Sequence, residues 1–227
     1  MAKQKEKTVW FCNECGADSP KWVGRCPACG AWNTMVEERV APKSADSWSG
    51  SPRKGGIVQR TSPQRVSEIK AGDETRIHMP SEELNRVLGG GLVSGSMVLV
   101  GGEPGIGKST LVLQNILSIK SRRILYVSGE ESPQQIRMRA DRIGRLSDNC
   151  YIVTETSLEN IFEHIREIEP QLLIVDSIQT VASDALESAA GSVSQVRECA
   201  ARLLRYAKTE NVPVLLIGHI NKEGTLA

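Results

Sequence analysis

The sequence has few aromatic residues and almost no net charge. Aromatic side chains make up 4% of the 227 residues, and the formal net charge at neutral pH is +1. Bulk charge therefore gives no support for a polyanionic partner such as nucleic acid, and any such contact has to come from a local patch. The few aromatics are unevenly spread, because three of the four tryptophans (Trp10, Trp22 and Trp32) lie in the first 32 residues.

Long apolar runs are absent as well. No stretch approaches the roughly 18 apolar residues of a transmembrane helix, and the N-terminal sequence MAKQKEKTVWFCNECG contains no apolar core of signal-peptide length. We therefore expect a cytoplasmic protein without a membrane partner. In that compartment, closely spaced cysteines favour a metal site over disulfides.

Four of the six cysteines form two C-x-x-C pairs that are ten residues apart. The pairs are Cys12 with Cys15 and Cys26 with Cys29, and each is followed by glycine. Each pair places two thiolates on one side of a tight turn, so that together they predict a tetrahedral four-sulfur site. Because all four ligands come from the protein, we expect a structural Zn²⁺ that supplies the folding energy of the module. A redox-active dithiol pair is the alternative.

The residues beside these cysteines leave two interpretations open. Trp22, Arg25 and Trp32 could stack on the bases of a nucleic acid, or the tryptophans could cover the metal site. The composition indicates three zones, with a zinc ribbon at 1–40, a linker rich in Ser, Pro and Gly at 41–75, and an α/β domain at 76–227.

In the third zone, short apolar runs rich in β-branched residues alternate with helical periods. Capping signals precede three of the helices, namely Ser132 with Gln135, Thr156 with Glu159, and Ser192 with Gln195. The alternation predicts a mostly parallel sheet with helices on both faces and ligands at the carboxyl ends of the strands. The expected strands are 96–102, 122–130, 150–155, 172–176 and 212–218.

The first of these strands leads into a phosphate-binding motif. The sequence GEPGIGKS fits G-x-x-x-x-G-K-[ST], with an apolar strand before it and a helix after it. Backbone N–H groups and the helix N-terminus would face the phosphates of ATP. Lys108 would reach the β and γ phosphates, and Ser109 would offer its hydroxyl to Mg²⁺. The predicted nucleotide-binding residues are Gly102, Glu103, Pro104, Gly105, Ile106, Gly107, Lys108, Ser109 and Thr110.

Two carboxylates are expected beside the bound phosphates. Asp176 ends the apolar run LLIV at the Walker B position, where it would help Ser109 to hold Mg²⁺; otherwise it only caps a strand. Glu130 and Glu131 follow the second strand, and one of them is the candidate catalytic base. We favour Glu130, which directly follows the strand, because Glu131 lies nearer the next helix N-terminus, where negative charge is stabilising in any case.

A histidine also follows the last strand. His219 lies on the expected ligand edge of the sheet and could sense the γ-phosphate. We interpret it instead as a surface or packed residue, because a single histidine at a strand end carries little information.

The combination of a four-cysteine ribbon, a linker and a phosphate-loop domain closely resembles the RadA (Sms) family of bacterial DNA-repair proteins. The resemblance covers essentially the whole chain and rests on the C-x₂-C-x₁₀-C-x₂-C spacing and on LNRVLGGGLVSGSMVLVGGEPGIGKSTL, YVSGEES, LLIVDSIQT and GHINKEGTLA. It implies a RecA-like, DNA-dependent ATPase that forms hexamers and promotes branch migration of recombination intermediates. Single-stranded and branched DNA, RecA and replication-fork proteins are the implied partners. Carried over to this chain, the catalytic residues are Lys108, Glu130 and Asp176, and Zn²⁺ is bound by the four cysteines.

The sequence departs from this family in two respects. Members continue with a KNRFG motif and a Lon-protease-like domain, whereas this sequence stops at Ala227, so we expect an incomplete ATPase core. The segment after the Walker B strand, Gln179 to Ser194, contains Asp184 and Glu187 but no basic residue. It thus gives little electrostatic support for DNA contacts. Alternative functions are a RecA-like autokinase or signalling switch, and a zinc-dependent adaptor that uses its nucleotide for assembly only.

Overall fold

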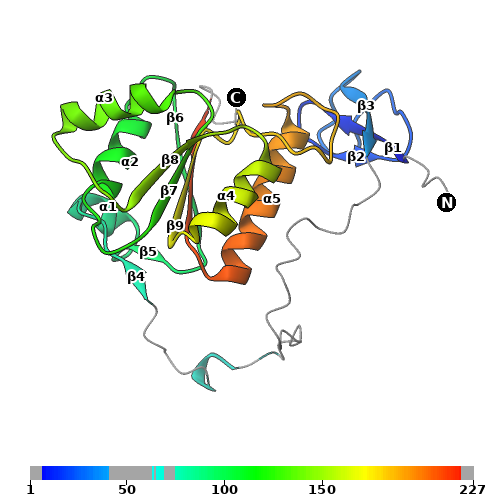
Figure 1. Ribbon diagram of the computed structural model, residues 1–227. Coiled ribbons are helices and arrows are strands. Elements are labelled where there is room, and N and C mark those ends of the chain that lie inside the picture. Colours follow the sequence, from blue (N-terminus) through cyan, green and yellow to red (C-terminus); the bar gives the residue numbers. More distant parts are fainter. Residues whose placement is uncertain (1–6, 41–62, 64, 69–74, 221–227) are drawn as a thin grey trace, which may run out of the picture.

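The computed structural model describes residues 7–40, 63, 65–68 and 75–220 of the chain. Figure 1 shows a small β-module at one side of a larger α/β domain. The predicted linker, 41–75, lies outside the described residues except at 63, 65–68 and 75; a short 3₁₀ helix, η1 (Val66–Glu68), is described within it. The last part of the predicted α/β domain, 221–227, also lies outside them.

The N-terminal module is a three-stranded antiparallel sheet. Its strands are β1 (Lys7–Cys12), β2 (Asp18–Ser19) and β3 (Met35–Val40), in the order β2-β1-β3. Three buried residues, Cys12, Cys26 and Met35, form its core. A core of this size cannot offset the conformational entropy of folding by itself, so the module requires a further stabilising element.

A five-stranded parallel sheet forms the centre of the α/β domain. All five strands predicted from the sequence are confirmed, with ends that differ by a few residues at most. The spatial order β6-β10-β9-β7-β8 brings strands that are distant in sequence side by side. The strands are β6 (Met97–Gly102), β7 (Ile124–Ser128), β8 (Cys150–Thr154), β9 (Leu172–Asp176) and β10 (Val214–His219).

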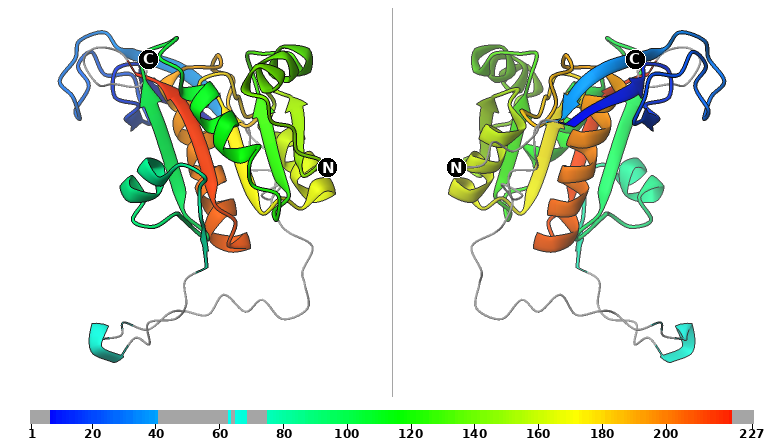
Figure 2. Two further views of the ribbon diagram at one scale, coloured as in Figure 1. Left: turned by 90° about the vertical axis from the view of Figure 1, so that its left-hand side faces the viewer. Right: turned by 90° about the vertical axis from the view of Figure 1, so that its right-hand side faces the viewer.

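Helices cover both faces of this sheet, as the sequence predicts (Figures 1 and 2). One buried cluster joins α2 (Lys108–Ile116) and α3 (Pro133–Ile143) to one face, and a second joins α4 (Leu158–Ile168) and α5 (Val193–Glu210) to the other. The first cluster also includes residues near α1 (Glu82–Val87). Others come from the antiparallel pair of β4 (Arg76–Ile77) and β5 (Leu92–Val93), which lie on either side of α1 in the sequence. None of the helices in the described part of the chain combines the length and apolar character that crossing a bilayer requires.

The helix starts follow the predicted capping signals in part. Ser132 and Gln135 form the expected capping box at α3. At α4 the prediction of Thr156 with Glu159 is wrong, because Ser157 is the N-cap. The carboxylate of Glu159 does not turn back to the helix start, since it binds residues of a neighbouring segment instead. Ser192 does cap α5.

The N-terminal module packs against the beginning of α5 (Figure 1). The Arg197 guanidinium donates a hydrogen bond to the carbonyl oxygen of Gly16. Gly16 is buried, and a methyl group added to it would lie 2.6 Å from the side chain of Val193. The contact is therefore close enough to require glycine at this position.

Candidate metal and nucleotide sites

The two C-x-x-C turns have the same backbone geometry. In the first turn, the N–H of Cys12 donates to Ala17 and the N–H of Gly16 donates to Cys12. In the second turn, Cys26, Ala31 and Gly30 repeat this pattern. Both glycines have positive φ, of 67° and 77°, which other residues adopt only with strain. The glycine after each cysteine pair therefore lets the turn close around the sulfur atoms.

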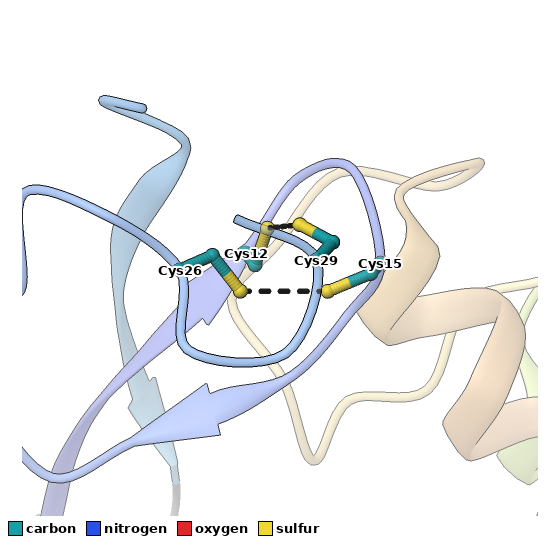
Figure 3. Close-up of side chains that lie close together, drawn as sticks. All are labelled: Cys12, Cys15, Cys26 and Cys29. Atoms are coloured by element: carbon teal, nitrogen blue, oxygen red, sulfur yellow. Dashed lines mark hydrogen bonds between the residues drawn. The ribbon is translucent and has the colours of Figure 1, made fainter. Parts of the chain in front are cut away.

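The four cysteine sulfur atoms converge on one point (Figure 3). All four lie within 4.8 Å of one another. The Cys12 and Cys29 sulfurs are 3.7 Å apart, and the Cys15 and Cys26 sulfurs are 3.6 Å apart. A tetrahedral Zn²⁺ with Zn–S bonds of about 2.3 Å holds its sulfurs about 3.8 Å apart. The predicted ligands are therefore brought together in an arrangement that fits this ion.

In each turn the protein environment lowers the pKa of the first thiol, that of Cys12 or Cys26, and raises the pKa of the second, that of Cys15 or Cys29. Burial raises the pKa of Cys12, but hydrogen bonds from the Thr34 hydroxyl and from backbone N–H groups outweigh it and lower the pKa to about 6. The backbone N–H of Cys29 is the largest of several groups that lower the pKa of Cys26 below its ordinary value. In each turn, one thiol thus has its pKa shifted toward favouring the thiolate, which is the form that binds metal.

The phosphate loop joins β6 to α2 and is open to solvent. Gly105 and Gly107 have φ values of 78° and 98°, and a methyl group added to either would meet no atom within 4 Å. These glycines are therefore required by the backbone conformation and leave space above the loop. Gly107 is the N-cap of α2, and no side chain caps the helix there. The first N–H groups of α2 are consequently available to an anion.

Lys108 is folded back over this loop. Its ammonium group donates to the carbonyl oxygens of Gly102 and Glu103, each at 2.8 Å, and lies 3.2 Å from Nδ1 of His219. The side chain is buried, with 8% of the residue exposed. The ammonium is therefore held at the mouth of the loop by backbone carbonyls.

Asp176 lies at the end of β9, as predicted, and is hydrogen-bonded to the neighbouring strand β7. The Tyr126 hydroxyl donates to its carboxylate at 2.5 Å, and both residues are buried. The pKa of Tyr126 is raised, mainly by burial and to a smaller extent by the negative charge of Asp176. Sequence patterns did not identify Tyr126 as a site residue. The one sequence feature that connects it to Asp176 is its position two residues before Ser128, on the same face of β7, because Ser128 is the register partner of Asp176. Ser109, which is predicted to hold Mg²⁺ together with Asp176, is the second residue of α2 and is half-buried.

The two glutamates after β7 have different partners. Glu130 accepts a hydrogen bond from the Ser177 hydroxyl at 2.8 Å and lies 3.1 Å from Nε2 of His219. Glu131 forms an ion pair with Arg139 of α3 instead. Glu130 therefore belongs to the polar cluster at the carboxyl edge of the sheet, whereas the Glu131 carboxylate is joined to a helix.

His219 connects Lys108 to Glu130 through its two ring nitrogens. The interpretation of His219 as an isolated surface or packed residue is therefore wrong, because its ring lies between two predicted site residues. The register of the sheet provides the reason: β10 lies between β6 and β9, and His219 pairs with Gly102 at the start of the phosphate loop. Strand order of this kind cannot be read from the local sequence.

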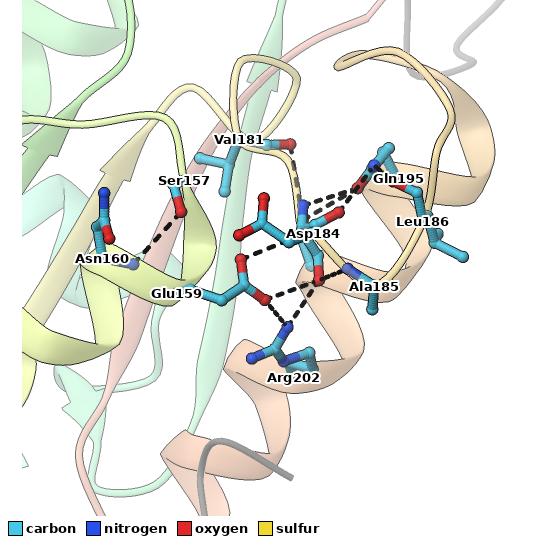
Figure 4. A network of polar contacts seen from close by, with 11 residues as sticks. Ser157, Glu159, Asn160, Val181, Asp184, Ala185, Leu186, Gln195 and Arg202 are labelled. Carbon is cyan, nitrogen blue, oxygen red and sulfur yellow. Dashed lines mark hydrogen bonds and ion pairs between the residues drawn. The ribbon is translucent and has the colours of Figure 1, made fainter. Parts of the chain in front are cut away.

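The segment after β9 is held by polar side chains from two helices (Figure 4). Gln195 of α5 accepts a hydrogen bond from the N–H of Ser183, and its amide nitrogen lies 3.0–3.1 Å from three carbonyl oxygens of residues 183–188. Glu159 of α4 binds Arg202 at 2.5 Å and accepts from the Ser183 hydroxyl and the Asp184 N–H. This part of the carboxyl edge thus has a defined conformation.

Replacing Glu159 with glutamine is expected to make the protein's stability less dependent on pH. Burial raises the pKa of Glu159, but Arg202 and the Asp184 N–H outweigh it, so that the pKa falls below its ordinary value of 4.5. A carboxyl group with a depressed folded-state pKa stabilises the protein fully above its ordinary pKa, and this contribution is lost as pH falls through the folded value. At neutral pH we expect a loss of about 1–3 kcal/mol in the free energy of unfolding.

Urea unfolding at a series of pH values measures this effect. The difference between the unsubstituted chain and Glu159→Gln should shrink as the solution becomes more acidic than pH 4.5. Glu163→Gln, at an exposed position on the same helix, serves as the matched control. An equal loss at all pH values would show that the ionised form of Glu159 is not what stabilises the segment.

Two family models match the chain. Residues 63–225 match a model described as an AAA domain, and residues 10–37 match a model described as a rubredoxin metal binding domain. The first match covers well over half of the chain. The second covers the four cysteines and most of the three-stranded module.

Several curated proteins are similar in sequence to nearly the full length of this chain. DNA repair protein RadA of Halalkalibacterium halodurans is 50% identical over 98% of the chain, and that of Bacillus subtilis is 48% identical over 100%. RadA of Pseudomonas aeruginosa is 48% identical over 98% of the chain. The resemblance expected from the motifs is thereby confirmed. The chain spans about half the length of these curated relatives, 49% in each case.

A solved structure supports the fold. The crystal structure of a KaiC-like protein from Pyrococcus horikoshii has a TM-score of 0.52 and 22% sequence identity, covering 68% of this chain and 74% of that protein. This likeness and the parallel five-stranded sheet confirm the predicted RecA-like architecture, which is preceded by a zinc ribbon.

Proposed function

The chain belongs to the AAA domain family, and from this membership and its similarity to RadA proteins we propose that it is a DNA-dependent ATPase of recombinational DNA repair. One observation carries the proposal. The phosphate-loop residue Lys108, the candidate base Glu130 and the Walker B residue Asp176 all lie at the carboxyl edge of one parallel sheet, where such folds bind their ligands.

The phosphate loop would bind ATP through its backbone N–H groups. The predicted binding residues are those of 102–110, with the Lys108 ammonium leaving its carbonyl partners to contact the β and γ phosphates. Ser109 and Asp176 would hold a Mg²⁺ ion, which neutralises charge on the phosphates. Zn²⁺ in the ribbon would be structural, since four protein ligands leave no position open for a reactant.

Glu130 would be the base that orients or deprotonates the attacking water. Its carboxylate is held by Ser177 and His219 and remains about half exposed, so that water can reach it. Glu131 would be structural, because its carboxylate is paired with Arg139.

Matched amide substitutions separate these two roles. Glu130→Gln is expected to lower the rate of ATP hydrolysis by about 10²- to 10⁴-fold while ATP binding is kept, because the amide cannot accept a proton. Glu131→Gln loses one half-buried ion pair and is expected to keep its turnover with a modest loss of stability. Equal rates for the two variants would exclude Glu130 as the base.

The finer parts of the proposal rest on the family resemblance. We propose that single-stranded and branched DNA are bound, that the full-length protein forms hexamers, and that it promotes branch migration and the processing of recombination intermediates. RecA and replication-fork proteins are the proposed partners, and the cytoplasm is the proposed compartment.

Measuring ATP hydrolysis with and without single-stranded DNA tests the proposed function. We expect a several-fold stimulation by DNA. A rate that does not respond to DNA would contradict the proposal. Phosphate transfer to the protein itself would then indicate an autokinase, and stable assembly without turnover would indicate an adaptor.

A further inference from the structure

The two turns of the zinc ribbon have different surroundings. The first turn faces α5, where the buried Gly16 accepts a hydrogen bond from Arg197. Figure 3 shows Cys15 on the side nearer α5 and Cys26 on the far side of the cluster. In the second turn the residues Pro27 to Cys29 are exposed. One turn of the ribbon is thus used for contact with the ATPase domain, while the other is open to a partner.

Two tryptophans lie exposed beside the open turn. Trp22 is 55% exposed and Trp32 is 70% exposed, whereas Trp10 packs against the buried core around Cys12 and Met35. Trp22 and Trp32 therefore do not cover the metal site, which was one of the two interpretations that the sequence allowed. Large exposed aromatic side chains of this kind are typical of binding surfaces.

The two exposed rings have different neighbours. The backbone of Trp32 forms a bridge with Arg25, and the Arg25 guanidinium lies 5.8 Å from the centre of the Trp32 ring. The Nε–H of Arg25 donates to the carbonyl oxygen of Gly30 at 3.0 Å. The Trp22 ring lies near Gly24, where an added methyl group would be 3.5 Å from it. The Trp32 ring is thus supported by Arg25, which reduces the entropy lost on binding.

The charged side chains nearest to these tryptophans in the sequence are positive. Lys21 and Arg25 are the only charged side chains between Ser19 and Val36, and both are exposed. Four thiolates around Zn²⁺ carry a formal net charge of −2, which the two positive charges of Lys21 and Arg25 formally balance. We therefore expect ring stacking to contribute more to binding than attraction to phosphates.

We propose that Lys21, Trp22, Arg25 and Trp32, here called the tryptophan face, bind unpaired bases of single-stranded DNA by stacking. The inference rests on the proposed function and assigns part of its DNA contact to the zinc ribbon. Unpaired bases expose the π faces that tryptophan and arginine recognise, and such stacking does not depend on base sequence. The segment after β9 is a poorer candidate, because Asp184 and Glu187 are its only charged residues.

The test is the equilibrium binding of a fluorescein-labelled oligothymidine to the full 227-residue chain, measured by anisotropy. Trp22→Ala and Trp32→Ala are each expected to weaken binding by about ten-fold or more. Trp32→Phe, which keeps a ring, should retain most of the affinity. Tyr151→Ala removes an aromatic residue that is 42% exposed on β8 and should change nothing. Zinc content, measured for every variant, reports whether the ribbon is folded.

A second measurement avoids substitutions. Saturating oligothymidine is expected to quench the tryptophan emission of the unsubstituted chain, because bases stack on Trp22 and Trp32. Binding without quenching would overturn the inference, as would equal affinities of the zinc-loaded alanine variants and the unsubstituted chain. Either result would leave the proposed function standing if DNA still stimulates ATP hydrolysis. An unsubstituted chain that neither binds the oligonucleotide nor responds to it in hydrolysis would overturn both.

Discussion

Lys108→Ala is expected to abolish ATP hydrolysis and to weaken ATP binding strongly. The ammonium group is the one buried cation at the phosphate loop among the described residues, and backbone carbonyls hold it at the loop's mouth. Alanine cannot neutralise the charge that develops on the transferred phosphoryl group. Removal of one such group from a preorganised site lowers turnover by about 10²- to 10³-fold, which would bring a slow ATPase to background.

Steady-state hydrolysis and the binding of a fluorescent ATP analogue measure the two effects separately. The control is Lys120→Ala, which removes an exposed lysine beyond the end of α2 and should leave both unchanged. Circular dichroism should show a folded variant, because the lost contacts of Lys108 are two hydrogen bonds to loop carbonyls and one to His219. Full turnover by a folded Lys108→Ala variant would exclude this loop as the catalytic nucleotide site.

Removal of the metal is expected to unfold the ribbon while the α/β domain remains folded. The ribbon has three buried core residues, and two of them, Cys12 and Cys26, are predicted ligands. Metal binding to such modules contributes about 10–16 kcal/mol at neutral pH, so no residual core can replace it. The α/β domain has two large apolar clusters of its own, one on each face of the sheet.

Chelator titration followed by tryptophan fluorescence and far-ultraviolet circular dichroism distinguishes the two parts. Emission should shift as the surroundings of Trp10 are lost, while the helical signal persists. Cys12→Ser should reproduce the chelated state, and Cys199→Ser, at a buried cysteine outside the cluster, should keep its metal. A ribbon that stays folded without metal would exclude a structural role for the ion, and two-electron oxidation of the cysteines would then favour the dithiol alternative.

Local signals in the sequence determined much of this protein. The run LLIVD is β9 with the predicted bounds, and Ser132 with Gln135 starts α3 as predicted. The phosphate loop and the four cysteines likewise have the expected geometry. These features depend on residues that lie within a few positions of one another, so their spacing carries the necessary information.

The tertiary structure alone decided which side chains meet. The order of the strands brings His219 between Lys108 and Glu130, and it places the Tyr126 hydroxyl on Asp176. Likewise, the ion pair between Glu131 and Arg139 joins the segment after β7 to the helix α3.

Packing between segments distant in sequence decided the remaining differences. The carboxylate of Glu159, predicted to cap α4, is bound by Ser183 and Arg202, and the helix begins at Ser157 instead. The first cysteine turn docks on α5, whereas Trp32 beside the second turn is exposed. Contacts of this kind arise from strand order and domain packing, which local sequence patterns do not encode, and they determine which of the predicted residues can act together.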